Sequence, residues 1–464
     1  MKKILCLFVG LVVFSFALFS QSDDDLFGGD DDLFGDDDFL IEEVTDVSAK
    51  SDLSKGVLFD NGTVKIGGNF TSEISTSFLV YADDDKSFME HFSDTKISPN
   101  VGAYLTVDAR PTQDLRMYTK FGLRYPFSSK ATSTATTTKM SFGGQDFYNT
   151  KVDTSITDWI YLKELFTDFS VADTAFFRFG LHTVTWGAGY FFSPVSDIIN
   201  TSMIDPENTD AQVDGCFNLR TQITFPDTQN CLWVYVMPAF DYAKNCAFAG
   251  KYDLVLGGWE LGLGGYWKYE AAPKVTFTAS GSLKKFNLFG EAVFQYGSDL
   301  EWDNEKDKTA IFKATAGFSY TWKDPLITLV GQYYYDGNNF EFDDQTFMYM
   351  YNDNKMYIKN NFTKGHNAAL ALSFGRIAGT TKLTAAVFGI VNFGKEDLSS
   401  QVTDLLKEYG AESFLSTGTF SAMLNYAPTN SITLGIGPHM TFADWDSKPD
   451  VALKLSFTLG GGKF

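Results

Sequence analysis

Charged side chains stand at alternate positions in one short stretch of the sequence. Arg178 and His182 share one parity, whereas Phe177 and Phe179 take the other. Because successive side chains of a β-strand point to opposite faces, this spacing predicts a strand with one charged face and one apolar face. A charged face of this kind can pair ions, order water or select among ions, which is electrostatic chemistry rather than bond breaking.

Neighbouring stretches add further charges at the same parity. If the apolar parity faces lipid, the polar surface receives Arg110, Arg116, Lys120, Arg124, Glu164, Asp168, Arg178, His182 and Arg220. The basic members come from successive predicted strands, so they could form a ladder on one side of a water-filled interior. Alternatively, these charges only solvate the wall and pair with one another, as Glu164 with Arg178 or Asp168 with His182. Both interpretations stay open on the sequence alone.

Other kinds of chemistry find no support in the spacing of residues. Covalent catalysis needs a nucleophile, a base and an orienting group together, and no local motif offers them, so we expect no enzyme. The four histidines are not at ligand spacing and no CxxC pattern occurs, so we expect no metal and no cofactor. For His182 we expect a neutral, hydrogen-bonding role. The GLGG run at 262–265 has strand-like flanks, unlike a nucleotide-binding loop. A net charge of −21 argues against nucleic acid as a partner.

The N-terminal sixty residues are predicted to precede the folded domain. Residues 1–20 hold two lysines and then an apolar run, as in a secretory signal peptide, which implies export. Residues 21–60 form an acidic, low-complexity segment that contains DDDLFG twice, and such a block of like charges is expected to be disordered. It is either a solubilising leader or a docking peptide for a periplasmic partner or for the interior of the chain's own fold. The three cysteines beyond residue 20 are an odd number, which argues against a disulfide framework.

Alternation with a period of two residues dominates residues 61–464. It is clearest at 101–110, 115–124, 275–280, 382–387 and 451–459. No run of eighteen apolar residues follows the leader, so no transmembrane helix is expected. Aromatic residues make up 16% of the chain, including 45 Phe and 22 Tyr. An exported chain with these properties is expected to be all-β, a transmembrane antiparallel up-and-down β-barrel with aromatic girdles.

Short and long connections alternate between the predicted strands. Short turns are predicted at 111–113, 171–174, 226–229, 270–273, 323–325, 375–379 and 427–430. Longer loops are predicted at 83–97, 127–157, 187–214, 239–251, 298–308, 337–364, 394–412 and 443–449. The pattern predicts about 16 strands, in a range of roughly 14–18, with both termini on the short-turn side. This number treats Lys284-Lys285 as a β-bulge inside one long strand rather than as a hairpin turn.

Part of the sequence resembles the porin-type outer-membrane barrels of diderm bacteria. The segments are LKELFTDF (162–169), RFGLHTVTWGAGYFFSPVSDIIN (178–200) and LWVYVMP (232–238). They are similar to a signature in which a strand with an inward Glu precedes G-R-Q-x-x-x-W-G, a loop with Asp and Asn-Pro, and a strand ending in Pro. Here His182 replaces the usual Gln and Thr201 replaces the usual Pro. Elsewhere the resemblance is architectural, and it implies passage of a solute without naming the solute.

The third long loop, residues 187–214, is expected to form the constriction of the passage. In sixteen-stranded porins the third loop folds into the interior, and the resemblance implies the same here. The loop carries Asp197 and Asp205 among other acids. An acidic loop that faces a basic wall creates a transverse field, which orients dipolar solutes, while charged rings set ion preference.

The leading interpretation is an outer-membrane porin or solute-selective channel for small polar or anionic solutes. The alternative is an outer-membrane transporter for hydrophobic solutes such as long-chain fatty acids, plugged by the N-terminal segment. An outer-membrane hydrolase and an adhesin are further hypotheses. Expected partners are outer-membrane lipid, the barrel-assembly machinery, periplasmic chaperones and a small-molecule solute, with oligomerisation left open. The expected location is the outer membrane of a diderm bacterium, with periplasmic termini.

Overall fold

The computed structural model describes most of the chain beyond residue 56. The described residues are 57–81, 87–95, 97–126, 133–142, 145–154, 160–172, 174–184, 186–199, 215–226, 228–240, 242–297, 309–337, 365–393, 418–429, 432–442 and 448–463. The predicted signal peptide and all but the last four residues of the predicted acidic segment therefore lie outside the described residues. The same holds for the C-terminal Phe464.

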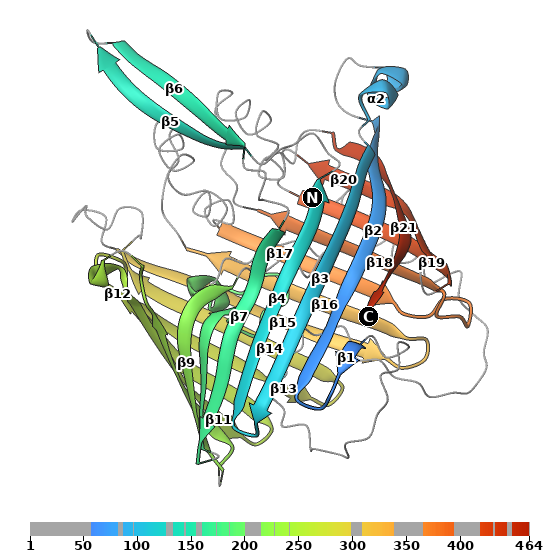
Figure 1. Ribbon diagram of the computed structural model, residues 1–464. Coiled ribbons are helices and arrows are strands. Elements are labelled where there is room, and N and C mark those ends of the chain that lie inside the picture. Colours follow the sequence, from blue (N-terminus) through green and yellow to red (C-terminus); the bar gives the residue numbers. More distant parts are fainter. Residues whose placement is uncertain are drawn as a thin grey trace. The chain divides into compact units, whose positions relative to one another are not determined.

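Eighteen of the described strands form one antiparallel ring (Figure 1). The first nine are β2 (Val64–Tyr81), β3 (Ile97–Thr112), β4 (Leu115–Pro126), β7 (Ile160–Val171), β8 (Ala175–His182), β9 (Cys216–Phe225), β10 (Asn230–Met237), β11 (Ala247–Leu256) and β12 (Trp259–Lys268). The second nine are β13 (Lys274–Leu283), β14 (Phe286–Tyr296), β15 (Ala310–Trp322), β16 (Ile327–Asp336), β17 (Gly365–Phe374), β18 (Leu383–Asn392), β19 (Gly418–Thr429), β20 (Ile432–Phe442) and β21 (Asp450–Lys463).

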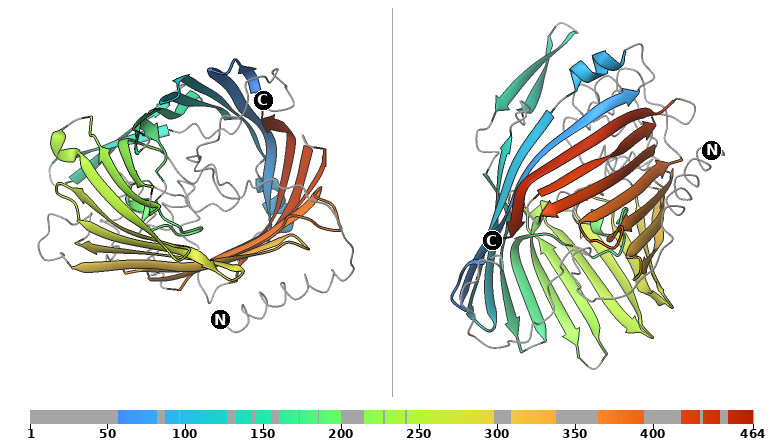
Figure 2. Two further views of the ribbon diagram at one scale, coloured as in Figure 1. Left: turned by 90° about the horizontal axis from the view of Figure 1, so that it is seen from below. Right: turned by 90° about the vertical axis from the view of Figure 1, so that its right-hand side faces the viewer.

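The ring closes because its last strand pairs with its first. Residues of β21 are antiparallel partners of β2 along most of its length, for example Leu455 with Thr76. Every other ring strand pairs with the ring strands that precede and follow it in the sequence. The predicted antiparallel up-and-down barrel is therefore confirmed, and the left panel of Figure 2 shows the ring from one end. The expected number of about 16 strands is wrong, because the ring contains 18.

Two tight hairpins explain the difference in strand number. Gly257 and Gly258 form the turn between β11 and β12, and Leu256 pairs with Trp259 across this turn. Both glycines have positive φ, of 59° and 82°, which fits a two-residue hairpin turn. Lys284 and Lys285 form the turn between β13 and β14, and Leu283 pairs with Phe286 across this turn. The prediction of a β-bulge at these two lysines is therefore wrong. Lys284 itself has a φ of 61°.

The two extra turns also move one connection to the other edge of the ring. The predicted short turn at 270–273 joins β12 to β13, and it lies at the edge that carries the long connections. The other six predicted short turns join neighbouring strands at the opposite edge, together with Gly257-Gly258 and Lys284-Lys285. Each extra hairpin turn reverses the direction of the strands that follow, so the two turns cancel. The connection after β14 therefore lies at the edge of the long connections, as the sequence predicts. The ring begins with β2 and ends with β21 at the short-turn edge, since the number of strands is even.

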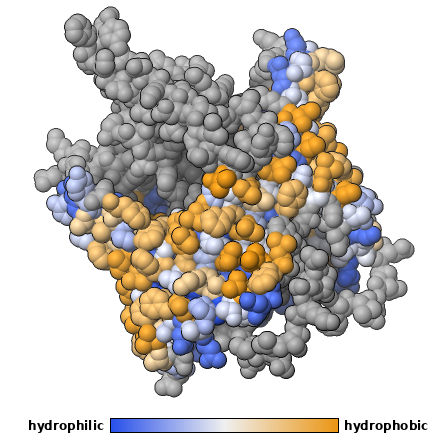
Figure 3. All heavy atoms as spheres, in the orientation of Figure 1, coloured by the Kyte–Doolittle hydropathy of each residue, from blue (hydrophilic) through white to orange (hydrophobic). Residues whose placement is uncertain are grey.

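The two faces of the ring differ in polarity as the alternation predicts. The outward parity carries large apolar side chains that remain exposed, such as Leu105, Phe121, Phe277 and Leu455. The inward parity carries polar side chains that are buried; they include Gln222, Lys251, Thr276, Glu291, Thr315, Gln332, Asn367 and Ser421. Figure 3 shows the apolar cover over the outer surface of the strands on its visible face.

Smaller elements accompany the ring. β1 (Val57–Asp60) pairs with the start of β2. β5 (Ser133–Phe142) and β6 (Gln145–Thr154) form a separate hairpin within the connection between β4 and β7. A short helix, α2 (Phe88–Asp94), lies between β2 and β3. Two single-turn 3-10 helices are η3 (Ser196–Ile198) and η5 (Ala243–Asn245). In the described part of the chain, no helix has the length and apolar character needed to cross a membrane.

Candidate functional site: the interior of the ring

The segment that follows β8 lies inside the ring of strands. Residues 186–199 bond to side chains of β14 and β16, which are six and eight strands away from β8 around the ring. A connection on the outside, or beyond the rim, could not reach inward-facing side chains of such distant strands. We call residues 186–199 the inner segment (green in the left panel of Figure 2).

Glu291 of β14 is the first anchor of the inner segment. Its Oε1 accepts the backbone N–H of Gly189 at 2.6 Å, and its Oε2 accepts that of Val195 at 2.9 Å. The carboxylate is 3% exposed. A carboxylate buried to this degree needs such donors, since an unpaired charge away from water is costly. The bonds therefore fix both ends of a tight bend in the backbone.

Gln332 of β16 is the second anchor. Its Oε1 accepts backbone N–H groups of Tyr190, Phe191 and Phe192 at 3.1, 2.7 and 3.3 Å. Its Nε2 donates to the carbonyl oxygen of Phe192 at 2.6 Å and to Oγ1 of Thr315 at 2.7 Å. One amide side chain thus makes hydrogen bonds with the backbone groups of three consecutive residues that do not belong to any strand. Burial also raises the pKa of the Tyr190 phenol, which keeps it protonated.

Two glycines permit this close approach. A side chain on Gly187 would place its Cβ 2.3 Å from Oε1 of Glu291. A side chain on Gly189 would place its Cβ 2.0 Å from the carbonyl oxygen of Phe192. Both distances are shorter than non-bonded atoms allow. Residues 187 and 189 must therefore be glycine, because the backbone here packs directly against the wall and against itself.

Apolar packing fills the space between the inner segment and one half of the wall. Val184, Trp186 and Val195 form a buried cluster with Tyr235, Ala249 and Val293 of β10, β11 and β14. Phe191 and Phe192 form a second cluster with Val330, Tyr334 and Ala369 of β16 and β17. Lys251 of β11 is buried beneath the first cluster, and its Nζ donates to the carbonyl oxygen of Trp186 at 3.1 Å and pairs with Asp253 at 3.0 Å. The inner segment is thus packed onto the wall formed by β10 to β17.

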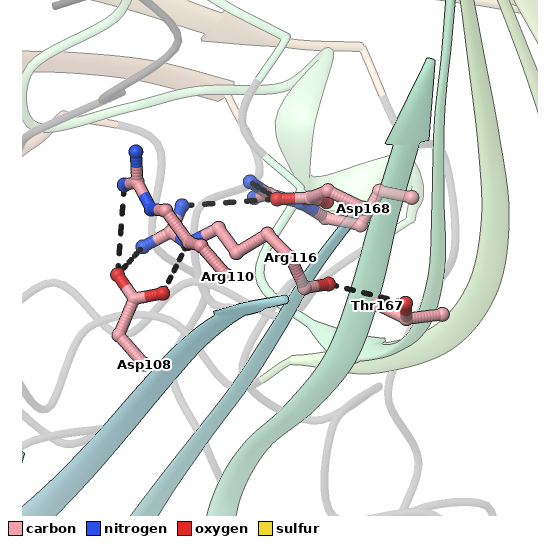
Figure 4. A network of polar contacts seen from close by, with 6 residues as sticks. Asp108, Arg110, Arg116, Thr167 and Asp168 are labelled. Atoms are coloured by element: carbon pink, nitrogen blue, oxygen red, sulfur yellow. Dashed lines mark hydrogen bonds and ion pairs between the residues drawn. The ribbon is translucent and has the colours of Figure 1, made fainter. Parts of the chain in front are cut away.

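The opposite part of the wall carries a network of charged side chains (Figure 4). Arg116 of β4 pairs with Asp108 of β3, with Nη2 3.0 Å from Oδ2, and lies 3.7 Å from Asp168 of β7. Arg178 of β8 makes a two-pronged bond to Asp168, at 2.6 and 3.0 Å. Arg110 lies 3.6 Å from Asp108 and is more exposed, with its side chain 60% accessible. β4 and β15 stand nine strands apart in both directions around the ring, so this network faces the half that holds the anchors.

An aromatic ring supports the arginines. The guanidinium of Arg178 lies 4.0 Å from the ring centre of Phe166, and that of Arg116 lies 5.9 Å from it. His182 packs edge-on to the same ring at 5.9 Å and is 1% exposed. Neither ring nitrogen of His182 has a hydrogen-bond partner of good geometry among the described residues, and its hydrogen-bonding role stays a prediction. Arg220 is the cross-strand neighbour of Arg178 and lies 5.5 Å from the ring of Trp233.

Two lysines form a further basic position along the same wall. Lys120 of β4 and Lys163 of β7 place their ammonium groups 4.8 and 5.4 Å from the ring centre of Tyr104. Lys120 is the cross-strand partner of Glu164. The strand register slips at this point, and the extra residue in β7 is Lys163. The slip brings a lysine to Tyr104 that strict alternation would have placed on the other face.

The structure brings together most of the charged residues named from the sequence. Arg116, Lys120, Glu164, Asp168, Arg178, His182 and Arg220 lie on adjacent strands β4 to β9. The pairing differs from both suggested pairs, because Asp168 binds Arg178 and Arg116 rather than His182. Asp197 lies in η3 of the inner segment. The side chain of Arg124 and all of Asp205 lie outside the described residues.

Sequence reasoning missed the anchors and the acid that pairs with Arg116. Asp108, Glu291 and Gln332 each stand at the inward parity of a strand whose other parity is apolar. That parity is the signal that could have found them, since a buried acid or amide inside a strand needs a partner. The inward position of Glu291 was missed because residues 274–297 were interpreted as one long strand.

The remaining described residues add no metal site. No group of three or more His, Cys, Asp or Glu in the described ranges has the geometry to hold a metal ion. Cys216, Cys231 and Cys246 are free thiols. The GLGG run lies inside β12, where Gly264 would place a Cβ 2.7 Å from the carbonyl oxygen of Gly250. The position of the run inside a strand agrees with its strand-like flanks in the sequence.

Solved bacterial proteins, among them the outer membrane protein OpdK, are similar in structure to this chain. OccK9 (OpdG) of Pseudomonas aeruginosa is 9% identical with a TM-score of 0.49, over 86% of this chain and 98% of that one. OccAB4 of Acinetobacter baumannii is 9% identical with a TM-score of 0.48, over 87% and 100%. OpdK of Pseudomonas aeruginosa, solved with vanillate, is 9% identical with a TM-score of 0.48, over 86% and 98%. No protein-family model and no curated protein matches the sequence. The closed barrel is established by the strand pairing of this chain itself.

Proposed function

We propose that this protein is an outer-membrane porin or solute-selective channel for small polar or anionic solutes. The observation that carries the proposal is the inner segment, which is held across the interior of a closed barrel by Glu291 and Gln332. A barrel of eighteen strands is wide enough to enclose an aqueous passage, as barrels of this size do in membranes. The inner segment would then form the constriction of that passage.

The polarity of the two faces supports a position in a membrane. Outward positions are apolar, with aromatic rings towards both edges, whereas inward positions are polar and charged. A water-soluble barrel would have the opposite distribution, because burial of apolar area drives its folding. In this proposal the long connections face the exterior and both ends of the barrel face the periplasm.

The charge on the part of the wall opposite the anchors, formed by β3, β4 and β7 to β9, supports a preference for anions. Three arginines, Arg116, Arg178 and Arg220, share that surface with two aspartates, Asp108 and Asp168. Lys120 and Lys163 add positive charge beside Tyr104, and Glu164 offsets one of them. The basic residues therefore exceed the acidic residues on the described part of this wall, and a passage lined in this way favours anions electrostatically.

The proposal is tested by swelling of vesicles that contain the refolded protein. The solutes are a neutral sugar, the corresponding sugar acid and the corresponding amino sugar, which have nearly equal size. We expect all three to enter, the acid fastest and the amine slowest. Exclusion of all three by a correctly folded barrel would overturn the channel proposal. Equal rates for acid and amine would overturn the preference for anions.

A further inference from the structure

The helix α2 exposes apolar side chains and buries a polar one, which is the reverse of a helix packed on a protein surface. Phe88, Met89 and Phe92 are 51%, 67% and 56% exposed, whereas the polar His91 is buried. A helix at a protein surface normally buries its apolar stripe and exposes polar residues. We call Phe88, Met89 and Phe92 the apolar face of α2.

Local sequence determines where this helix begins. Ser87 is the N-cap, and its hydroxyl accepts the backbone N–H of Glu90 at 3.4 Å. Glu90 in return accepts the backbone N–H of Ser87 at 2.6 Å. This capping box satisfies two backbone donors, but a helix of seven residues is too short to be stable by itself in water. Its apolar face therefore needs an apolar surrounding.

The apolar face continues the outward surface of the barrel. Phe78 of β2 stands at the outward parity, opposite Leu453 of β21. Its ring meets those of Phe88 and Phe92 edge-on, at 5.3 Å in both cases. Figure 3 shows apolar residues over α2 and over the end of the outer strands next to it. The helix thus prolongs the apolar outer surface beyond the strand, on the side of the long connections.

We propose that α2 lies in the membrane interface, with Phe88, Met89 and Phe92 inserted between lipids at the level of the headgroups. This inference rests on the proposed membrane location of the barrel. Its occupant is lipid because the apolar face is continuous with the surface that would contact lipid. A short helix with one apolar face and polar residues such as Glu90 and Asp94 elsewhere is suited to the boundary between acyl chains and headgroups.

The position of the helix gives the insertion a consequence for the barrel. α2 directly follows β2, which is the strand that closes the ring against β21. Lipid contacts at α2 would hold this helix at the membrane surface. They would thereby keep it beside the closing strands rather than above the mouth of the passage.

The test measures contact between lipid and a label on α2 in the full chain. In a variant with Cys216, Cys231 and Cys246 replaced by Ser, Met89→Cys carries an environment-sensitive fluorophore in vesicles that contain nitroxide lipids. Nitroxide near the headgroup is expected to reduce the fluorescence about twofold, and nitroxide deep in the acyl chains less. Phe121→Cys, outward on β4, is the positive control, and Lys285→Cys, in the β13–β14 turn, is the negative control.

The controls separate this inference from the proposed function. Quenching at Phe121→Cys without quenching at Met89→Cys would overturn the inference and leave the membrane barrel intact. Absence of quenching at both positions would overturn the membrane location itself. Protection of Met89→Cys from lipid and from aqueous quenchers, together with cross-linking between copies, would show that α2 binds a second copy. That result also overturns the inference.

Discussion

At the scale of single residues, Asp168 is the acid on which the charged wall depends. It receives two bonds from Arg178 and lies 3.7 Å from Arg116. Its side chain is 13% exposed, so solvent screens these contacts only in part. One carboxylate thus moderates two guanidinium groups that face the proposed passage, and in the proposed channel its charge would lower the attraction of the wall for anions.

Replacement of Asp168 by Asn tests this role. The variant removes one negative charge, so the wall becomes more positive and the ratio of anion to cation permeability should rise. A unit charge about 8 Å from an ion in water contributes about 0.5 kcal/mol, with opposite sign for anion and cation, so the ratio should change roughly fivefold. The measurement is the reversal potential across a salt gradient.

Two further variants complete the comparison at Asp168. Arg178→Gln should shift the reversal potential in the opposite direction. Lys285→Gln, which removes a charge from an exposed turn at the short-turn edge, should leave it near the wild-type value. A shift of the same sign in Asp168→Asn and Arg178→Gln would contradict the electrostatic account.

Parity predicted which charged residues share a surface, but not which of them pair. Arg116, Arg178 and Asp168 were assigned to one face from alternation alone, and the structure brings them together. Their pairing depends on strand register, which places Arg116 and Arg178 on either side of Asp168. Register is decided by turns and bulges distant from the charges, so it could not be read from these residues.

At the scale of elements, two side chains determine the position of the inner segment. Glu291 and Gln332 together accept five of its backbone N–H groups. The loss of an acceptor for a buried donor costs about 1–3 kcal/mol. The wall, rather than the loop sequence alone, thus holds the proposed constriction in place.

Glu291→Ala should release the inner segment near Gly189 and Val195. Two buried donors lose their acceptor, so the segment should fluctuate, and single-channel current should become noisier with a larger mean conductance. Gln332→Leu should have a similar effect near Phe191. Gln295→Ala is the matched control, because Gln295 lies inward on the same strand as Glu291 but, among the described residues, its side chain bonds to Gly297 and not to the inner segment. Equal noise in Glu291→Ala and Gln295→Ala would mean that the anchor has no role in conduction.

The arrangement of hairpins supplies a second test at this scale. Tyr269 and Lys285 lie in the two turns that flank β13 and must therefore face opposite sides of the membrane. In intact cells, with the three native cysteines of the barrel replaced by Ser, an impermeant maleimide should label Tyr269→Cys. Lys285→Cys should react only after the membrane is opened. Labelling of both from outside would contradict the hairpin at Lys284-Lys285.

The sequence predicted the strands better than the turns. Glycine at 257 and 258 is a strong hairpin signal, but these residues lay inside a stretch taken as one strand after a long loop. Lys284-Lys285 carries no turn residue of the usual kind, and Lys284 adopts a positive φ that lysine seldom takes. Its turn is set by the pairing of β13 with β14 along the whole hairpin rather than by the two turn residues themselves.

At the scale of the whole molecule, the barrel is apolar outside and polar inside. Leu455 and Ser456 are neighbours on β21 that point in opposite directions, outward and inward. Leu455→Arg places a charge in the proposed lipid, which should lower the free energy of unfolding by about 2–4 kcal/mol near the middle of the membrane. Ser456→Arg should cost less, because its side chain reaches the polar interior. Urea unfolding of both variants in vesicles measures the difference, and equal losses would contradict the membrane account.

The central claim is that the closed barrel conducts ions through a passage narrowed by the inner segment. The most direct measurement is the single-channel conductance and reversal potential of the refolded protein in a planar bilayer under a salt gradient. The account predicts stable open steps and a reversal potential that favours anions. Absence of current steps from barrels shown to be folded and inserted would contradict it.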